Sequence, residues 1–153
     1  MKFTQPCFIR KNTPELRKRL EELGYLPPSE IWYDENFAIC TILRDNVGEY
    51  IVFKIDDDFE RIIVPSYPYI DCGDNEELFL ALAGLRDDND VNQLFYYEGK
   101  LVVCVQDFSS TLNIYNDKFY KVKLFDNKNI LFEVPFKKLR KCTVEEIIER
   151  FKK

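Results

Sequence analysis

The chain has 153 residues, of which 46% are hydrophobic and 32% charged, and its formal net charge is −5 with a pI of about 4.9. A chain of this length and composition can bury a sizeable core, so wholesale disorder is excluded and one domain over residues 1–153 is expected. The sequence contains no histidine, which excludes catalysis by Ser-His-Asp or Cys-His arrangements.

Three short amphipathic helices are predicted from the spacing of large apolar residues and from polar residues suited to helix N-caps. They begin near Asn12, Asp74 and Thr143, and in each case a glutamate follows three residues later. This pattern predicts a capping box at each start, in which the cap and the glutamate bond each other's backbone amides. For the first helix, Thr13 followed by Pro14 is an equally good cap.

Two β-hairpins are predicted from runs of β-branched and aromatic residues that are separated by turn residues. The predicted strand pairs are residues 37–43 with 49–54, and residues 94–97 with 101–105. Together with strand-like residues at 119–134, they predict an α+β fold in which the three helices pack on a mainly antiparallel sheet.

The two halves of the chain match each other at an offset of about 70 residues. Tyr50 aligns with Tyr120, and Cys72 aligns with Cys142. A period of this length predicts an internal duplication within one domain, in which two strand-strand-helix segments superpose.

Cysteine spacing and hydropathy predict a cytoplasmic protein with reduced thiols. The five cysteines are odd in number and far apart, so the sequence contains no CxxC pair for a metal or a redox disulfide. The first residues contain no apolar signal-peptide segment, and no uncharged apolar run reaches the ~18 residues of a membrane span. We therefore expect no membrane association, no disulfide, no transition metal and no cofactor.

Charge is distributed unevenly along the chain. Residues 45–107 contain fifteen acidic and four basic residues, a net charge of −11, whereas residues 108–153 have a net charge of +5. An acidic field of this kind steers association with a basic protein surface. The candidate partner-binding residues are Asp56, Asp57, Asp58, Glu60, Asp87, Asp88 and Asp90, with Tyr67 and Tyr69 as apolar anchors in a proline-flanked loop. A core-facing position is the alternative for the two tyrosines.

The same carboxylates leave a metal-assisted enzyme open as an alternative, with residues 56–58 and 87–90 holding a divalent cation. The run from Asp88 to Asn92 has the spacing of the first three ligands of a calcium loop. However, Gln93 stands where that loop needs a glycine, and Gly99 stands where it needs a bidentate glutamate. We therefore assign no metal ligand and no catalytic residue.

The basic C-terminal part could neutralise a single strand of nucleic acid, since aromatic residues such as Phe119 and Phe136 are close in sequence to four cations, Lys137, Lys138, Arg140 and Lys141. The acidic pI argues against direct binding of nucleic acid. In the alternative interpretation, which assigns no binding role, these aromatic residues lie in the core and the lysines lie on a solvated face.

The stretch from Asp71 to Asp88, with its motif Asp-Asn-Glu-Glu-Leu-Phe-Leu-Ala-Leu, and residues 8–16 upstream resemble uncharacterised small acidic proteins of phages and mobile elements of gut bacteria. The resemblance covers about a third of the chain. It implies a context in which small acidic proteins bind and block a host machine, some by imitating the charge of nucleic acid.

Charge and resemblance together lead us to expect a non-enzymatic binding protein. In this interpretation, a phage-encoded inhibitor uses its acidic surface to occupy a basic, nucleic-acid-binding groove of a host defence complex. Two alternatives stay open, which are the metal-assisted carboxylate enzyme and an acidic immunity protein that neutralises a basic toxin nuclease.

Overall fold

The computed structural model describes residues 5–27, 34–44, 47–54, 69–86, 90–109 and 118–151. Within these ranges, three α-helices and nine strands form two mostly antiparallel sheets, which confirms the predicted α+β class. The chain divides into two compact units, which are described separately. Unit 1 comprises Met1–Asp88 and Ile147–Lys153, and unit 2 comprises Asn89–Glu146.

Unit 1 contains a four-stranded sheet with the strand order β3-β2-β1-β4. The strands are β1 (Cys7–Ile9), β2 (Phe37–Arg44), β3 (Val47–Lys54) and β4 (Ile70–Asp71). Strands β2 and β3 form the first predicted hairpin, in which Phe37 lies opposite Lys54. Strand β1 lies in the middle of the sheet, antiparallel to β2 and parallel to β4.

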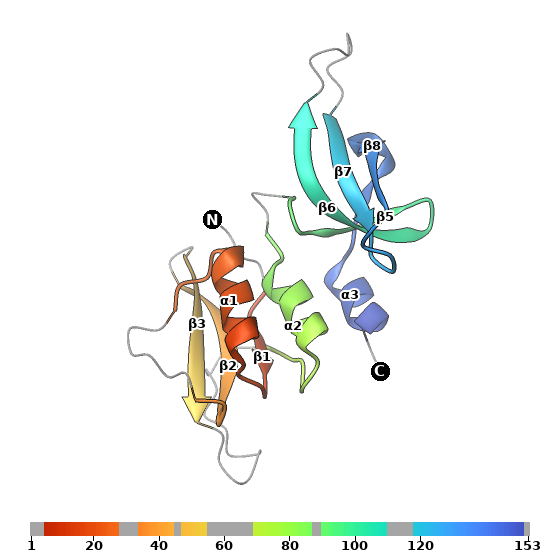
Figure 1. Cartoon of the computed structure of the whole chain (residues 1–153). Coiled ribbons are helices and arrows are strands. Elements are labelled where there is room, and N and C mark those ends of the chain that lie inside the picture. Colours follow the sequence, from red (N-terminus) through yellow and green to blue (C-terminus); the bar gives the residue numbers. More distant parts are fainter. Residues whose placement is uncertain are drawn as a thin grey trace. The chain divides into compact units, whose positions relative to one another are not determined.

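Helices α1 (Pro14–Leu23) and α2 (Glu76–Ala83) lie side by side over one face of this sheet (Figure 1). Leu16 and Leu20 of α1 are fully buried, as are Phe79 and Leu82 of α2. Their spacing of three or four residues is the reason that one face of each helix is apolar. Burial of each such side chain stabilises the fold by roughly 1.5–3 kcal/mol.

The opposite face of the same sheet is also buried at its centre. Phe8 of β1 packs with Ala38, Cys40 and Ile42 of β2. Because side chains alternate across a strand, these residues lie on the face opposite Ile9 and Ile39, which belong to the helix-covered side.

Unit 2 contains a five-stranded sheet with the order β8-β7-β6-β5-β9, in which all neighbouring strands are antiparallel. The strands are β5 (Leu94–Tyr97), β6 (Lys100–Ser109), β7 (Lys118–Leu124), β8 (Leu131–Pro135) and β9 (Arg140–Lys141), with a 3₁₀ helix η2 (Phe136–Lys138) before β9. The second predicted hairpin is β5–β6. Its turn residues Glu98 and Gly99 have φ angles of 49° and 79°, as a tight type I′ turn requires.

The core of unit 2 lies on one face of its sheet. Its fully buried members are Phe95, Val102, Cys104, Tyr120, Val122 and Val134. The ring of Tyr120 contacts Phe95 edge-on, with 5.9 Å between centroids, and contacts Phe136 of η2 at 5.1 Å. Helix η2 therefore covers part of this core.

The N-cap residues are among those predicted, except at α2, where the cap lies one residue further along the chain than predicted. Helix α1 is capped by Thr13, whose hydroxyl accepts the Leu16 amide at 3.2 Å, so the Thr13–Pro14 alternative is confirmed over Asn12. Helix α2 is capped by Asn75 and not by the predicted Asp74. The side chain of Asn75 forms two hydrogen bonds. Its oxygen accepts the Leu78 amide, and its nitrogen donates to the Phe151 carbonyl at 2.7 Å.

The two units share part of the predicted duplication. The order β3-β2-β1-β4 in unit 1 has a counterpart in β7-β6-β5-β9 in unit 2, and α2 and α3 (Val144–Phe151) follow the last strand in each case. However, β4 is parallel to β1, whereas β9 is antiparallel to β5. This reversal means that the two segments cannot be superposed along their whole length.

Candidate functional site

Most of the residues predicted to bind a partner lie outside the described ranges. These are Asp56, Asp57, Asp58, Glu60, Tyr67, Asp87 and Asp88. The structure describes the other two, Asp90 and Tyr69. Both of them contact residues of their own unit.

Asp90 takes part in a polar cluster within unit 2. The hydroxyl of the buried Tyr120 donates a hydrogen bond to Asp90 Oδ2, and Lys141 Nζ lies 3.6 Å from Oδ1. The cluster links Asp90, in the segment that precedes β5, to β7 and β9. The charge of Asp90 is therefore partly neutralised within the unit, and its contribution to an acidic docking surface is reduced.

Tyr69 packs on the core of unit 1. Its ring meets Phe8 edge-on, with 5.6 Å between the ring centroids, and its side chain is half-buried. Edge-to-face packing of this kind contributes about 0.5–1.5 kcal/mol beyond area burial. This geometry favours the core-facing alternative for Tyr69 over the role of apolar anchor.

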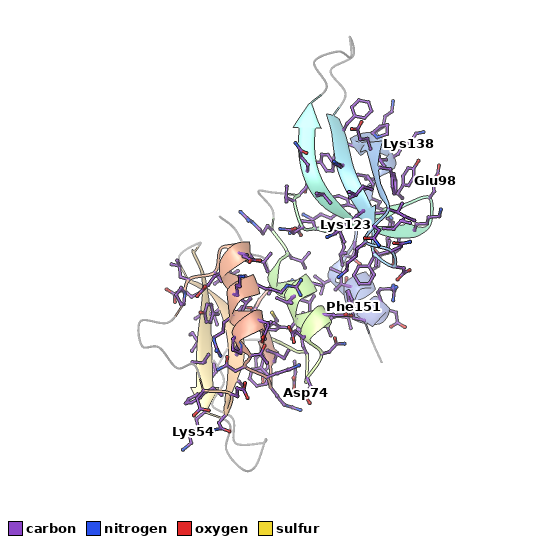
Figure 2. All side chains as sticks on the ribbon, in the orientation of Figure 1. Lys54, Asp74, Glu98, Lys123, Lys138 and Phe151 are labelled. Atoms are coloured by element: carbon purple, nitrogen blue, oxygen red, sulfur yellow. The ribbon has the colours of Figure 1, made fainter. Side chains whose placement is uncertain are left out.

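The described part of the acidic middle region includes a group of carboxylates between β4 and the first turn of α2. Asp71 accepts a hydrogen bond from Arg10 at 2.8 Å, and Glu76 lies 3.3 Å from Lys11. Asp74 and Glu77 are exposed, and Figure 2 shows Asp74 at the end of unit 1. Among the ion pairs of the described residues, none involves Asp74 or Glu77.

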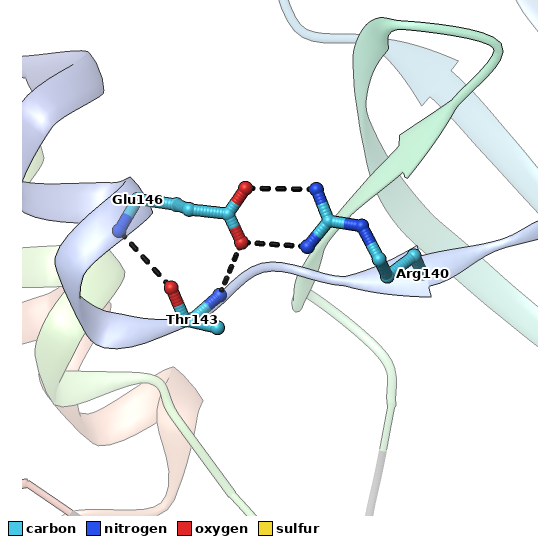
Figure 3. Close-up of polar contacts among 3 residues, drawn as sticks. All are labelled: Arg140, Thr143 and Glu146. Carbon is cyan, nitrogen blue, oxygen red and sulfur yellow. Dashed lines mark hydrogen bonds and ion pairs between the residues drawn. The ribbon is translucent and has the colours of Figure 1, made fainter.

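A charged cluster of three residues holds the start of α3 (Figure 3). Arg140 donates two hydrogen bonds to the Glu146 carboxylate, at 2.7 and 2.8 Å. Glu146 and Thr143 form the predicted capping box, with amide-to-side-chain distances of 3.1 and 3.2 Å. The Arg140 guanidinium also lies 5.0 Å from the centroid of the Tyr96 ring. Its contacts join the residues just before α3 to the first turn of that helix, so we assign it a structural role at the helix start.

The electrostatics of Glu146 follow from these contacts. The Arg140 hydrogen bonds, and then the Thr143 backbone amide, lower the pKa of Glu146 to about 2. In return, the carboxylate raises the pKa of Arg140. Glu146 is therefore ionised at neutral pH and unsuited to be a general acid.

All five cysteines are buried free thiols. Burial raises the pKa of Cys40 and Cys72 to about 12 and that of Cys142 to about 11, and it raises the pKa of Cys7 as well. The thiolate is the nucleophilic form of cysteine. These four thiols are therefore poor nucleophiles at neutral pH.

The basic C-terminal residues divide into two groups. Arg140 and Lys141 contact acidic side chains, whereas Lys137 and Lys138 of η2 are exposed. Phe136 beside them is 43% exposed. Sequence reasoning grouped these four cations together, since it could not show that β9 brings two of them next to carboxylates.

The described ranges contain no group of three or more histidine, cysteine, aspartate or glutamate residues placed to hold a metal ion. Among the helices in the same ranges, none has the length and apolar composition needed to cross a membrane. Comparison with protein families, with curated proteins and with solved structures finds no match to this chain.

Proposed function

We propose that this chain is a non-enzymatic binding protein whose acidic middle region, residues 45–107, docks on the basic, nucleic-acid-binding groove of a host defence complex. The observation that carries the proposal is the net charge of −11 over these residues. The exposed carboxylates of Asp74 and Glu77 belong to this region, and they are available to a basic partner. A phage-encoded inhibitor would act in this way.

The chemistry of the other described groups supports binding over catalysis. The buried thiols are poor nucleophiles, and Glu146 is held by Arg140. Asp90 stays among the residues proposed to contact the partner, although Tyr120 and Lys141 partly neutralise its charge within unit 2.

The test begins with affinity capture from a lysate of the native host, with and without nuclease treatment, followed by measurement of association and dissociation rates for the captured protein. The first variant combines Asp74→Asn with Glu77→Gln. A second variant replaces Asp56, Asp57 and Asp58 by asparagine. A matched control combines Glu145→Gln with Glu149→Gln, which removes two exposed charges of α3 from outside the acidic middle region.

We expect the first two variants to slow association several-fold at low salt and to reduce its salt dependence, because charges at an interface rim act mainly on the encounter rate. The control should leave the rate unchanged within about twofold. Equal rates and equal salt dependence for all variants would refute the acidic docking surface.

The same experiment separates the alternatives. A captured basic nuclease would favour the immunity protein, since that partner presents the same kind of surface. A stoichiometric divalent cation in the purified chain, with no captured protein, would favour the metal-assisted enzyme.

A further inference from the structure

Helix α3 is anchored by polar contacts at both of its ends. At its start, Arg140 and Thr143 bond the Glu146 carboxylate, and Arg140 belongs to strand β9. At its last residue, the Phe151 carbonyl accepts a hydrogen bond from the side-chain amide of Asn75 at 2.7 Å. The boundary between the two units falls between these anchors, after Glu146, so α3 contributes residues to both units.

The length of α3 makes it dependent on these anchors. The helix has eight residues, and a helix this short is marginal on its own because its nucleation is costly. Its apolar residues Ile147 and Phe151 are buried. The last four carbonyls of a helix have no partner within it, and the Asn75 amide satisfies that of Phe151. Loss of either anchor should therefore fray α3 from that end.

Asn75 also holds the start of α2. Its side-chain oxygen accepts the Leu78 amide at 3.2 Å, and its backbone carbonyl accepts the Phe79 amide at 3.1 Å. Among the residues that cap helices well, asparagine has a separate donor atom and acceptor atom, whereas aspartate only accepts. Because the two atoms belong to one planar carboxamide, a displacement of α3 that breaks the Phe151 bond also disturbs the cap of α2.

We propose that α3 couples the cluster of Arg140, Thr143 and Glu146 to the first turn of α2. A change that loosens the cluster loosens this turn, and loss of the Asn75 bond loosens the cluster to the same degree, since coupling between two sites is reciprocal. The segment so controlled includes Glu77 in the first turn of α2. Its importance for docking rests on the proposed function, whereas the coupling itself does not.

A direct contact between the two ends does not explain such a coupling. Phe151 follows Thr143 by eight residues, which corresponds to about 12 Å along a helix. Changes at sites more than about 7–10 Å apart that share no partner are normally independent. A mutual dependence of the two ends would therefore be carried by α3.

The test is hydrogen exchange of single amides, measured by NMR on the full chain without a partner. Thr143→Ala weakens the first anchor, and the amide of Phe79 reports its effect on α2. The acceptor of this amide is a backbone carbonyl, which the substitution leaves in place. The amide of Leu20, in α1 of the same unit, is the reference for opening of the whole unit.

The reciprocal variant is Asn75→Ser, and the amide of Glu146 reports its effect on the start of α3. Serine caps a helix about as well as asparagine does, but it lacks the second polar atom that reaches Phe151. Two substitutions serve as matched controls. Glu149→Gln changes an exposed residue of α3, and Thr13→Ser changes the cap of α1 in the same conservative way.

We expect Thr143→Ala to speed exchange of the Phe79 amide about threefold and to leave the Leu20 amide unchanged. Asn75→Ser should speed exchange of the Glu146 amide by a similar factor. Each control should change the rates by less than about 1.5-fold. In the double variant, Thr143→Ala should lose its effect on Phe79, because the bond that transmits this effect is already absent.

Three results would overturn the proposal. The first is an unchanged Phe79 rate in Thr143→Ala, and the second is an equal acceleration at Leu20, which would mean that the whole unit is destabilised. The third is the same effect of Thr143→Ala on Phe79 with and without Asn75→Ser. Because no partner is present, none of these results bears on the acidic docking surface, which is tested separately by association rates.

Discussion

Replacing Thr143 by alanine removes the side-chain half of the capping box at the start of α3. In the structure, the Glu146 amide donates to the Thr143 hydroxyl at 3.2 Å. Loss of a threonine N-cap costs about 1 kcal/mol, within a range of roughly 0.5–2 kcal/mol. Since Thr143 is exposed, water can solvate the released amide, and we expect a value in the lower half of that range. The folding equilibrium should change by roughly twofold to eightfold.

The other half of the capping box is the Glu146 carboxylate, which accepts the Thr143 amide, and it makes the stability of the fold depend on pH. The folded-state pKa of Glu146 is lowered to about 2 by Arg140 and by the Thr143 amide, whereas an unfolded glutamate titrates near about 4.3. A group with a lowered folded pKa stabilises the fold above its unfolded pKa, and this contribution is lost as the pH falls towards the folded pKa. The contribution of Glu146 should therefore fade between about pH 4.5 and about pH 2. In Glu146→Gln, this part of the pH dependence should be absent.

Urea unfolding followed by circular dichroism at pH 7 measures the first effect, and NMR titration of the Glu146 carboxyl carbon measures the second. Thr143→Ser is the control for the alanine variant, because serine keeps a hydroxyl at the same position. The reasoning fails if serine destabilises the chain as much as alanine does. It also fails if the Glu146 carboxyl titrates at the value of an unfolded glutamate.

Three further predictions concern unit 2 and the thiols. Tyr120→Phe removes the hydroxyl that donates to Asp90, and urea unfolding should show a loss of about 1–2 kcal/mol; unchanged stability would show that this hydrogen bond does not hold Asp90 in place. Gly99→Ala places a side chain at a φ of 79°, where nothing lies within 4 Å, so strain alone should cost about 1 kcal/mol, and a larger loss of thermal stability would indicate a different turn. Because all five cysteines are buried, a thiol reagent at pH 8 should find five thiols in denaturant and react slowly without it; rapid reaction of the folded chain would contradict this burial.

The local features of the fold were predictable because short-range chemistry determines them. The Thr143 capping box needs only a threonine and a glutamate three residues apart, and it is present as predicted. The Glu98–Gly99 turn follows in the same way from a glycine that adopts a positive φ angle freely, placed between two strand-like runs. The cap of α2 was predicted one residue early, since the choice of Asn75 over Asp74 depends on a bond to the distant Phe151 carbonyl.

Features that depend on long-range pairing were not predictable in the same way. Strand β1 is not among the predicted strands, because three residues carry too weak a periodic signal, yet it lies in the middle of the unit 1 sheet. The sequence also places Asp90 in an acidic run, whereas the structure joins it to Tyr120 and Lys141, which lie 30 and 51 positions further along the chain. A charge run shows how many carboxylates a segment has, but it does not show which of them are neutralised by contacts.

The overall pI of about 4.9 conceals an unequal division of charge between the two units. Unit 1 has thirteen basic and nineteen acidic residues, a net charge of −6, and unit 2 has nine basic and eight acidic residues, a net charge of +1. At physiological ionic strength the Debye length is about 8 Å, so a partner responds to the charges near its own contact surface and not to the total. The overall acidity is therefore no guide to the charge that a partner meets at one surface of either unit. For the same reason, salt dependence measured on the unmodified chain sums the effects of all surfaces, and only charge variants of one surface, each with a matched control elsewhere, can assign it.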